Sequence, residues 1–296
     1  MVLDKPAGIT SHGCVARVRK AYNLKRVGHG GTLDPAVTGV LPIALGPATR
    51  LLPYLPGEKT YRAIVQLGVR TTTDDLEGDC LAPMDPPSSL TEHDLQRALA
   101  PFRGSIDQRP PAFSAVHVQG QRAYALARAG ETVVLPARRV TVHRLTLLNW
   151  KPQQGLVELE IHCSSGTYIR SLARDLGDSL GCGGALAQLR RTASLGFDLS
   201  QSVPLEALTE PSARNGLAPA LPPLLDPLLV LGHLPQHRLR EEDGPGWRCG
   251  QTQECSQPWP LGTVVLIAAP DGKLAGLAKV EGAGVLQPRL VLHAKG

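Results

Sequence analysis

The segment Gly28–Pro42 constrains this chain more than any other part of its sequence. Three glycines and a histidine precede one carboxylate, Asp34, and an apolar run follows it. Glycine adopts positive φ angles at little cost, so this composition predicts a sharply bent loop that holds Asp34 in a defined place. An aspartate before a proline is also a common turn opener, because the residue before proline avoids the helical region. The segment alone therefore leaves two interpretations, a functional loop and an ordinary turn.

The length and composition of the chain limit its class. With 296 residues it can form one large domain with its own core and a smaller one. Its six cysteines show no C-x-x-C pair, so we expect reduced thiols rather than a zinc site or a disulfide framework. Its apolar runs are far shorter than the roughly 20 residues that span a bilayer, and we find no secretory leader. We therefore expect a soluble, cytoplasmic protein with no membrane partner.

Positive charge is concentrated in two parts of the chain, although the net charge is only +5. Residues 1–60 hold eight Lys and Arg against three Asp and Glu, and residues 101–145 hold seven against two. Such clusters favour a polyphosphate partner, because each neutralised phosphate releases counterions. For either cluster alone, a basic face that contacts only water is an equally good interpretation. Two clusters that flank the Gly28–Pro42 loop together favour nucleic acid.

Cap signals predict two helices in the first half of the chain. Thr10 or Ser11 can cap a helix that runs to about Tyr22 and carries arginines on its outer side. Thr91, with Asp94 three residues later, has the pattern of a capping box at the start of a second helix.

Apolar periodicity predicts strands around these helices. The predicted strands cover residues 41–45, 59–67, 140–148 and 156–163, and a short helix covers 48–55. Tyr61 falls near the exposed end of the second strand. The acidic run 71–79 lacks the carboxylate spacing of a calcium loop, so we interpret it as a connector exposed to water.

Arg170 lies in the first turn of a further predicted helix, which begins after Ser164–Thr167. The positive end of a helix dipole disfavours a cation there, so Arg170 predicts an acidic group close by. The region from about 106 to 139 is rich in arginine and poor in apolar residues, and we predict that it projects from the core as an insertion. The segment 185–191 predicts a helix.

The last part of the chain predicts a separate β module. A stretch rich in proline and leucine, 211–235, indicates a linker with a short helix. After it, Asp271-Gly272 between two apolar runs is typical of a hairpin turn. The chain has neither a G-x-G-x-x-G fingerprint nor a P-loop, so we expect no nucleotide cofactor, and no cluster indicates a metal.

Six segments of the chain resemble the TruB-type tRNA pseudouridine synthases, the bacterial relatives of dyskerin. They occur in family order, cover roughly residues 1–200, and are Leu3–Ser11, Gly28–Pro42, Lys59–Arg62, Arg109–Ala115, Gly166–Arg170 and Leu189–Arg191. Each alone is a weak signal, whereas six in order form a strong match.

The resemblance implies that the protein isomerises a uridine of tRNA to pseudouridine. The expected target is position 55 in the TΨC loop, and the reaction needs no cofactor and no obligate protein partner. By this resemblance Asp34 is the nucleophile, and it attacks either C6 of the uracil or C1′ of the ribose. The glycosidic bond then breaks, the base turns, and C5 joins C1′. The sequence does not choose between the two routes.

The chemistry predicts roles for other residues of these segments. A carboxylate buried in a site that excludes water needs a partner cation to stay ionised, so we predict that Arg170 pairs with Asp34. Tyr61 offers a flat face to a base taken out of its stack, and its hydroxyl can assist removal of the C5 proton. We favour this RNA-facing position of Tyr61 over a core position. The remaining predicted substrate-binding residues are His29, whose role the resemblance implies, Tyr168 and Leu189, of which the last fits core packing equally well.

The predicted fold class is α/β (α+β), with a central mixed, mostly antiparallel sheet of the pseudouridine-synthase type. The catalytic domain covers 1–228 and includes the insertion, which we expect to grip the folded RNA arm by its phosphates. A small PUA-like β domain covers 229–296. The alternative function is a non-catalytic RNA-binding or RNA-folding protein on the same scaffold. Asp34 together with Arg170 and Tyr61 favours the enzyme, because a binding protein needs no buried carboxylate that faces RNA phosphates.

Overall fold

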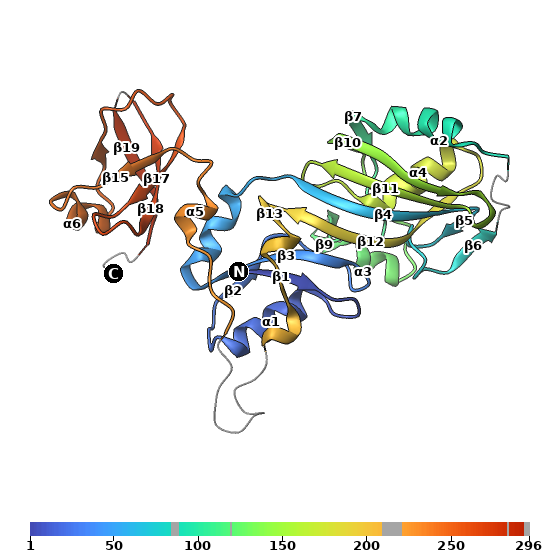
Figure 1. The fold of residues 1–296 in the computed structure, drawn as a ribbon, viewed down its shortest axis with the longest axis horizontal. Coiled ribbons are helices and arrows are strands. Elements are labelled where there is room, and N and C mark those ends of the chain that lie inside the picture. Colours follow the sequence, from blue (N-terminus) through green and yellow to red (C-terminus); the bar gives the residue numbers. More distant parts are fainter. Residues whose placement is uncertain (84–88, 119, 209–220, 283, 293–296) are drawn as a thin grey trace, which may run out of the picture.

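The described part of the chain forms a large β-sheet in the main body, a smaller one at the C-terminal end and two two-stranded hairpins (Figure 1). Their positions come from a computed structural model, which describes all residues except 84–88, 119, 209–220, 283 and 293–296. In the described residues, no helix has both the length and the apolar character needed to cross a membrane.

The large sheet has ten strands and a mixed topology. They are β1 (Val2–Lys5), β2 (Val27–His29), β3 (Thr38–Leu45), β4 (Lys59–Leu67), β7 (Gly104–Gln108), β10 (Arg138–Lys151), β11 (Leu156–Cys163), β12 (Gly184–Ser194), β13 (Phe197–Asp198) and β14 (Val203–Pro204). Their order is β14-β1-β3-β12-β4-β11-β10-β7, with β13 paired to β12 and β2 to β3. The pairs β1–β14 and β3–β12 are parallel and the others antiparallel, which confirms the predicted sheet type.

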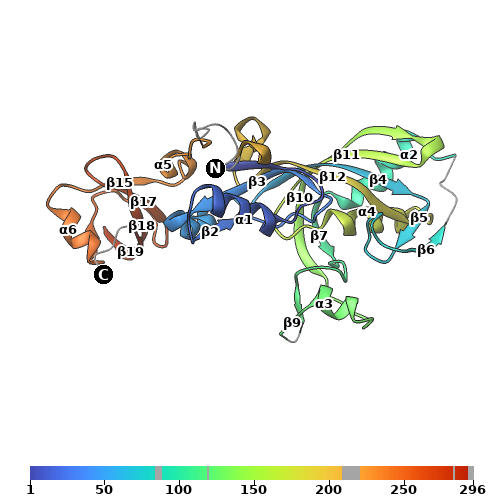
Figure 2. The same cartoon turned by 90° about the horizontal axis from the view of Figure 1, so that it is seen from below.

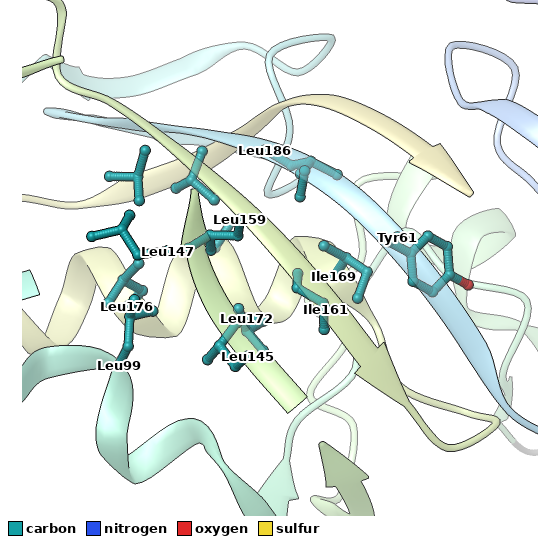
Figure 3. Packing of buried hydrophobic residues seen from close by; sticks show 14 of the residues in the cluster. Tyr61, Leu99, Leu145, Leu147, Leu159, Ile161, Ile169, Leu172, Leu176 and Leu186 are labelled. Atoms are coloured by element: carbon teal, nitrogen blue, oxygen red, sulfur yellow. The ribbon is translucent and has the colours of Figure 1, made fainter. Parts of the chain in front are cut away.

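One half of the large sheet packs against two helices, α2 (Glu92–Leu99) and α4 (Ile169–Ser179) (Figure 1). Alternate side chains of β4 and β11 point to the same side of the sheet, as the two-residue period of a strand requires. The buried cluster that they form with α4 includes Leu159, Ile161, Leu172 and Leu176 (Figure 3). Each such side chain contributes about 1.5–3 kcal/mol by leaving water. The capping box at Thr91 and Asp94 is present as predicted.

The other half of the large sheet packs against α1 (Ser11–Ala21). Thr10 caps this helix, because its hydroxyl accepts a hydrogen bond of 2.9 Å from the Gly13 N–H. Cys14, Val15 and Val18 are buried against the sheet, so the predicted helix is confirmed.

Between β7 and β10 the chain leaves the sheet and projects from it (Figure 2). This insertion is shorter than the predicted 106–139, because residues 106–108 pair with residues 138–140 as strands of the sheet. The insertion contains β8 (His117–Val118), β9 (Gln121–Arg122) and α3 (Ala123–Arg128). Val116, Ala123 and Leu135 give it a small core of its own.

The small sheet is the predicted C-terminal β module. Its order is β15 (Gln236–Arg238), β17 (Val264–Ala268), β18 (Leu274–Val280), β19 (Val285–Val291) and β16 (Gln253–Glu254). Trp247, in α6 (Asp243–Arg248), is buried in its core. Leucines including Leu51, Leu231 and Leu290 form a cluster between this module and the main body. The domain boundary at residue 228 stays a prediction.

Three predictions about secondary structure need correction or completion. The segment 185–191 is strand, because β12 pairs with β4 along its length and with β3 at its C-terminal half; this pairing overrides a spacing that also fits a helix. The predicted helix at 48–55 is a 3-10 helix, Gly46–Tyr54, which contains two prolines. Of the predicted linker 211–235, residues 211–220 lie outside the described part, and the rest contains α5 (Pro227–Val230). Further 3-10 turns cover Ala100–Phe102, Pro152–Gln154, Leu199–Gln201 and Leu205–Leu208.

Candidate active site

Asp34 and Arg170 form an ion pair at the centre of the large sheet. Arg170 Nη2 lies 3.0 Å from Asp34 Oδ2. The Arg170 side chain is 11% exposed, and that of Asp34 is 45% exposed. The structure thus brings together the pair that the sequence predicted. Asp34 is less buried than we predicted, because its loop presents the carboxylate at the surface of an open cleft.

The Asp34 loop is fixed by the N-terminal segment of the chain. Ser11 Oγ donates to the Leu33 carbonyl over 3.0 Å and accepts from the Leu33 N–H over 2.8 Å. On the other side of Asp34, the Pro35 carbonyl accepts from Lys5 Nζ over 2.9 Å and from the Gly8 N–H over 2.9 Å. The residues before and after Asp34 are therefore both held, which fixes the direction of its side chain.

Lys5 is a fully buried cation whose role the sequence analysis missed. Its ammonium also donates to the carbonyls of Pro6 and Ile9, over 2.8 and 2.7 Å. Burial lowers the pKa of Lys5, and the nearby Asp34 opposes this shift. Lysine side chains are normally exposed, so the residue type alone did not indicate a buried role. The three carbonyls around its ammonium show that Lys5 holds the Asp34 loop against the N-terminal segment.

Arg170 joins the Asp34 loop to two other segments. Its Nη1 donates to the Thr73 carbonyl and its Nη2 to the Phe113 carbonyl, each over 3.0 Å. A second carboxylate, Asp75 Oδ2, lies 3.5 Å from Nη1. Two carboxylates and two carbonyls therefore offset the unfavourable position of this cation at a helix N-terminus.

The acidic run 71–79 is part of the site, so its interpretation as a connector exposed to water is wrong. It lies in the hairpin of β5 (Val69–Thr71) and β6 (Cys80–Pro83). Besides the contact of Asp75 with Arg170, Asp74 Oδ2 pairs with Arg174 Nη1 over 2.8 Å. Burial raises the pKa of Asp74, and Arg174 opposes that rise. These pairs could not be read from the acidic run itself, because their partners lie on α4, far along the chain.

Tyr61 lies beside the ion pair, but its ring belongs to the core. It is 7% exposed and packs in the cluster under β4 and β11, with its hydroxyl at the edge of that cluster (Figure 3). The preference for an RNA-facing position over a core position was therefore wrong for most of the ring. Burial raises the pKa of Tyr61 to about 12, so the site disfavours the phenolate form of this side chain.

Arg191 is a second buried cation that the sequence analysis did not single out. Its Nε donates to the Val40 carbonyl over 2.8 Å, and its Nη2 donates to the Gly31 carbonyl over 3.1 Å. It lies next to Tyr61, and burial lowers its pKa. Gly39 lets β3 approach β12 here: its φ is +106°, and a Cβ would come within 2.1 Å of the Arg191 carbonyl oxygen.

Of the other predicted substrate-binding residues, Leu189 and Tyr168 line the cleft, whereas His29 is not among the residues that line either hollow. Leu189 is half-buried on β12 and lines the cleft on both sides of Asp34. Tyr168 precedes α4 and lines the cleft near Tyr61. His29 is half-buried on β2, and its Nδ1 accepts from the N–H of Gly31, which lines the cleft. Burial lowers the pKa of His29, which keeps the ring neutral at pH 7.

The cleft consists of two adjoining hollows that share Asp34, Arg170 and Leu189. The larger, of about 790 Å³, includes Tyr61 and Tyr168, and the smaller, of about 440 Å³, includes Arg62 and Gln188. Pockets for small ligands usually measure about 300–1,000 Å³, so either hollow is large enough for a nucleobase.

The projecting insertion forms one wall of the larger hollow. Tyr124 and Arg128 of α3 line it, and the Arg128 guanidinium lies 5.6 Å from the centre of the Tyr124 ring. A basic group stacked on an exposed aromatic ring suits nucleic acid, which offers both phosphates and base faces.

Metal-ligating residues do not gather in the described part of the chain: no group of three or more His, Cys, Asp or Glu side chains there is arranged to hold a metal ion. The six cysteines are free thiols. The groups that line the cleft are carboxylates, guanidinium groups, phenols, a lysine and apolar side chains.

Comparisons with known proteins agree with this arrangement. Residues 19–169 match the family model of the N-terminal domain of TruB family pseudouridylate synthases, and residues 170–230 match that of the tRNA pseudouridylate synthase B C-terminal domain. The chain is 58% identical to the tRNA pseudouridine synthase B of Parasynechococcus marenigrum (strain WH8102), over 100% of this chain and 98% of that protein. It is 56% identical to the protein of the same name from Synechococcus sp. (strain WH7803), over 100% of this chain and 97% of that protein.

Solved structures show the same fold. An H/ACA ribonucleoprotein bound to a substrate RNA containing 2′-deoxyuridine contains a chain that matches with a TM-score of 0.68 and 26% identity, over 98% of this chain and 84% of that one. A Cbf5–Nop10–Gar1 complex gives a TM-score of 0.67 and 27% identity, over the same shares of the two chains. The family models, the relatives and the fold lead to one conclusion: the chain belongs to the TruB family of pseudouridylate synthases.

Proposed function

We propose that this protein converts the uridine at position 55, in the TΨC loop of tRNA, to pseudouridine, with Asp34 as the nucleophile. Its curated relatives are named tRNA pseudouridine synthase B. The observation that carries the assignment of Asp34 is its ion pair with Arg170 in a cleft lined by Tyr61 and Leu189. The guanidinium places a positive charge against this carboxylate at a point where a bound base would displace water.

The target base must leave its stack to reach Asp34. The larger hollow accepts the flipped uridine, and the apolar side chain of Leu189 and the edge of Tyr61 contact the uracil. A carboxylate oxygen of Asp34 then forms a bond to C6 of the uracil or to C1′ of the ribose. The bond between C1′ and N1 breaks, the base turns, and C5 bonds to C1′ as the bond to Asp34 breaks. C5 loses its proton and N1 gains one, so the product is an isomer of the substrate.

The insertion supplies the grip on the RNA arm. Its arginines are exposed, and Arg128 and Tyr124 face the same hollow as Asp34. Contacts to phosphates and to one unstacked base place the arm without reading its whole sequence. We infer that the protein acts in the cytoplasm, where tRNA is used, and that tRNA is its only obligate partner.

The experiment incubates the protein with an unmodified tRNA transcript and maps pseudouridine at single-nucleotide resolution. We expect one pseudouridine, at position 55, and none in a transcript with cytidine at that position. Binding of the transcript without any pseudouridine would favour the alternative, an RNA-binding protein on the same scaffold. Pseudouridine at another position would keep the chemistry and overturn the choice of target.

A further inference from the structure

Gln108 holds the residue at which the Arg170 helix begins. It is the last residue of β7 and only 2% exposed. Its Nε2 donates to the Tyr168 carbonyl over 3.0 Å, and its Oε1 accepts from the Tyr168 N–H over 2.8 Å. One buried amide thus satisfies both backbone groups of a single residue, which fixes the plane and position of the chain there.

The segment that follows Gln108 is attached to the same helix. The Arg109 carbonyl accepts from Ser171 Oγ over 2.8 Å and from Arg174 Nη2 over 3.0 Å. The Phe113 carbonyl accepts from Arg170 Nη2 over 3.0 Å. The segment 108–113 therefore forms hydrogen bonds with four residues at the start of α4, which are Tyr168, Arg170, Ser171 and Arg174.

This segment is also the base of the insertion. Pro110 and Pro111 make it stiff, because each proline fixes its own φ angle and restricts the residue before it. Tyr168 packs against the core of the insertion, which contains Val116, Ala123 and Leu135. The insertion and the start of α4 are thus linked by a stiff segment, by hydrogen bonds and by apolar packing.

We propose that Gln108 is a positioning residue that links the grip of the insertion on RNA to the Asp34–Arg170 ion pair. This inference rests on the proposed function. Gln108 is too buried to touch RNA, so it acts through Tyr168 and the segment 109–113, which place the Arg170 guanidinium against Asp34. When RNA binds the insertion, the same contacts keep Arg170 and Asp34 aligned, and a misplacement of about 1 Å in such a site costs on the order of 10²-fold in rate.

The test is a double-mutant cycle between Gln108→Met and Arg170→Lys, measured as the single-turnover rate constant at saturating enzyme. Methionine keeps the length of glutamine but neither donates to nor accepts from the Tyr168 backbone. We expect Gln108→Met to lower the rate constant by about 10-fold to 100-fold while the Kd for tRNA changes by less than about threefold. In the Arg170→Lys background we expect Gln108→Met to add less than about threefold, because coupled residues are not additive.

Gln153→Met is the matched control, because Gln153 is exposed in the turn after β10; it should leave both constants unchanged. If Gln108→Met does not fold, Gln108→Asn carries the same cycle, since its amide keeps both polar groups but is one methylene shorter and cannot reach the Tyr168 N–H and carbonyl in the same way.

Three results would overturn the inference: an unchanged rate constant with only a lower Tm, a raised Kd with an unchanged rate constant, and losses that multiply in the double variant. Absence of pseudouridine with the unaltered protein is a different failure, since it removes the proposed function itself.

Discussion

The guanidinium of Arg170 lies 3.0 Å from the carboxylate of Asp34 and also donates hydrogen bonds to two backbone carbonyls. A side chain that supplied only a positive charge could not make all of these contacts. One planar group thereby joins the Asp34 loop, the acidic hairpin and the base of the insertion. Arginine has five donors in a fixed fork, whereas lysine has three on a single nitrogen, so the geometry explains the residue type.

Arg170→Met should lower the single-turnover rate constant by at least about 10²-fold, because Asp34 loses its partner and the three segments lose their common contact. The Kd for tRNA should change little, since Arg170 is buried. The control is Arg144→Met, which removes a pair with Glu160 on the outer surface. Equal rate constants for the two variants would contradict the role of Arg170.

Asp75→Asn should have a smaller effect, about 10-fold in rate constant, because Asp75 lies 3.5 Å from Arg170 and helps to orient it, whereas the closer contact of Arg170 is with Asp34. The substitution keeps the shape of the side chain and removes its charge. Asp79→Asn, in the same hairpin but exposed, provides the comparison and should leave the rate constant unchanged. A loss for Asp79→Asn as large as that for Asp75→Asn would show that only the net charge of the hairpin matters.

Tyr61→Phe should fold, because the ring stays in the core, and it should slow the reaction, because the hydroxyl at the cleft is lost. Burial raises the pKa of Tyr61 to about 12 in the folded protein, against its ordinary value of 10.0. The folded state therefore holds this proton more tightly, and the stability that Tyr61 contributes is complete below pH 10 and is lost as the pH rises through 12. Between pH 9 and 11, the Tm of Tyr61→Phe should fall less than that of the unaltered protein. An equal fall in both proteins would show that Tyr61 ionises freely.

Binding of tRNA should weaken steeply with salt, because each neutralised phosphate contributes roughly 0.7–0.9 to the slope of log affinity against log salt. Arg128→Gln should weaken binding and reduce this slope by about one. The control is Arg240→Gln, in the C-terminal module, where Arg240 is paired with Asp243 and Glu242. A flat salt response would contradict the electrostatic grip of the insertion.

Local signals in the sequence were enough to predict those helices whose ends are set by neighbouring residues. The helices that begin after Thr10 and Thr91 were predicted from their caps, because a cap acts within one turn. The segment 185–191 was predicted incorrectly, because its apolar spacing fits a helix and a strand, and only the pairing with β3 and β4 decides between them.

Contacts of the site could be predicted from the sequence where a charged residue needs a partner of opposite charge. Contacts that depend only on how the fold brings backbone carbonyls or distant side chains together could not be predicted. Asp34 needed a cation and Arg170 needed an acid, so their pairing followed from their types. Lys5 and Arg191 bind carbonyls instead, and no residue type in the sequence marks a cluster of carbonyls. Asp75 was missed for a related reason, since its approach to Arg170 depends on where a hairpin folds back.

The most direct measurement is conversion of an unmodified tRNA transcript by Asp34→Asn under single-turnover conditions, together with the Kd of the same complex. Asparagine keeps the size of the side chain and its place beside Arg170 but is no nucleophile. We expect no pseudouridine above the level without enzyme, and a Kd within about threefold of that of the unaltered protein, since phosphate contacts elsewhere supply most of the affinity. Conversion by Asp34→Asn at the rate of the unaltered protein would contradict the central claim that Asp34 attacks the uridine.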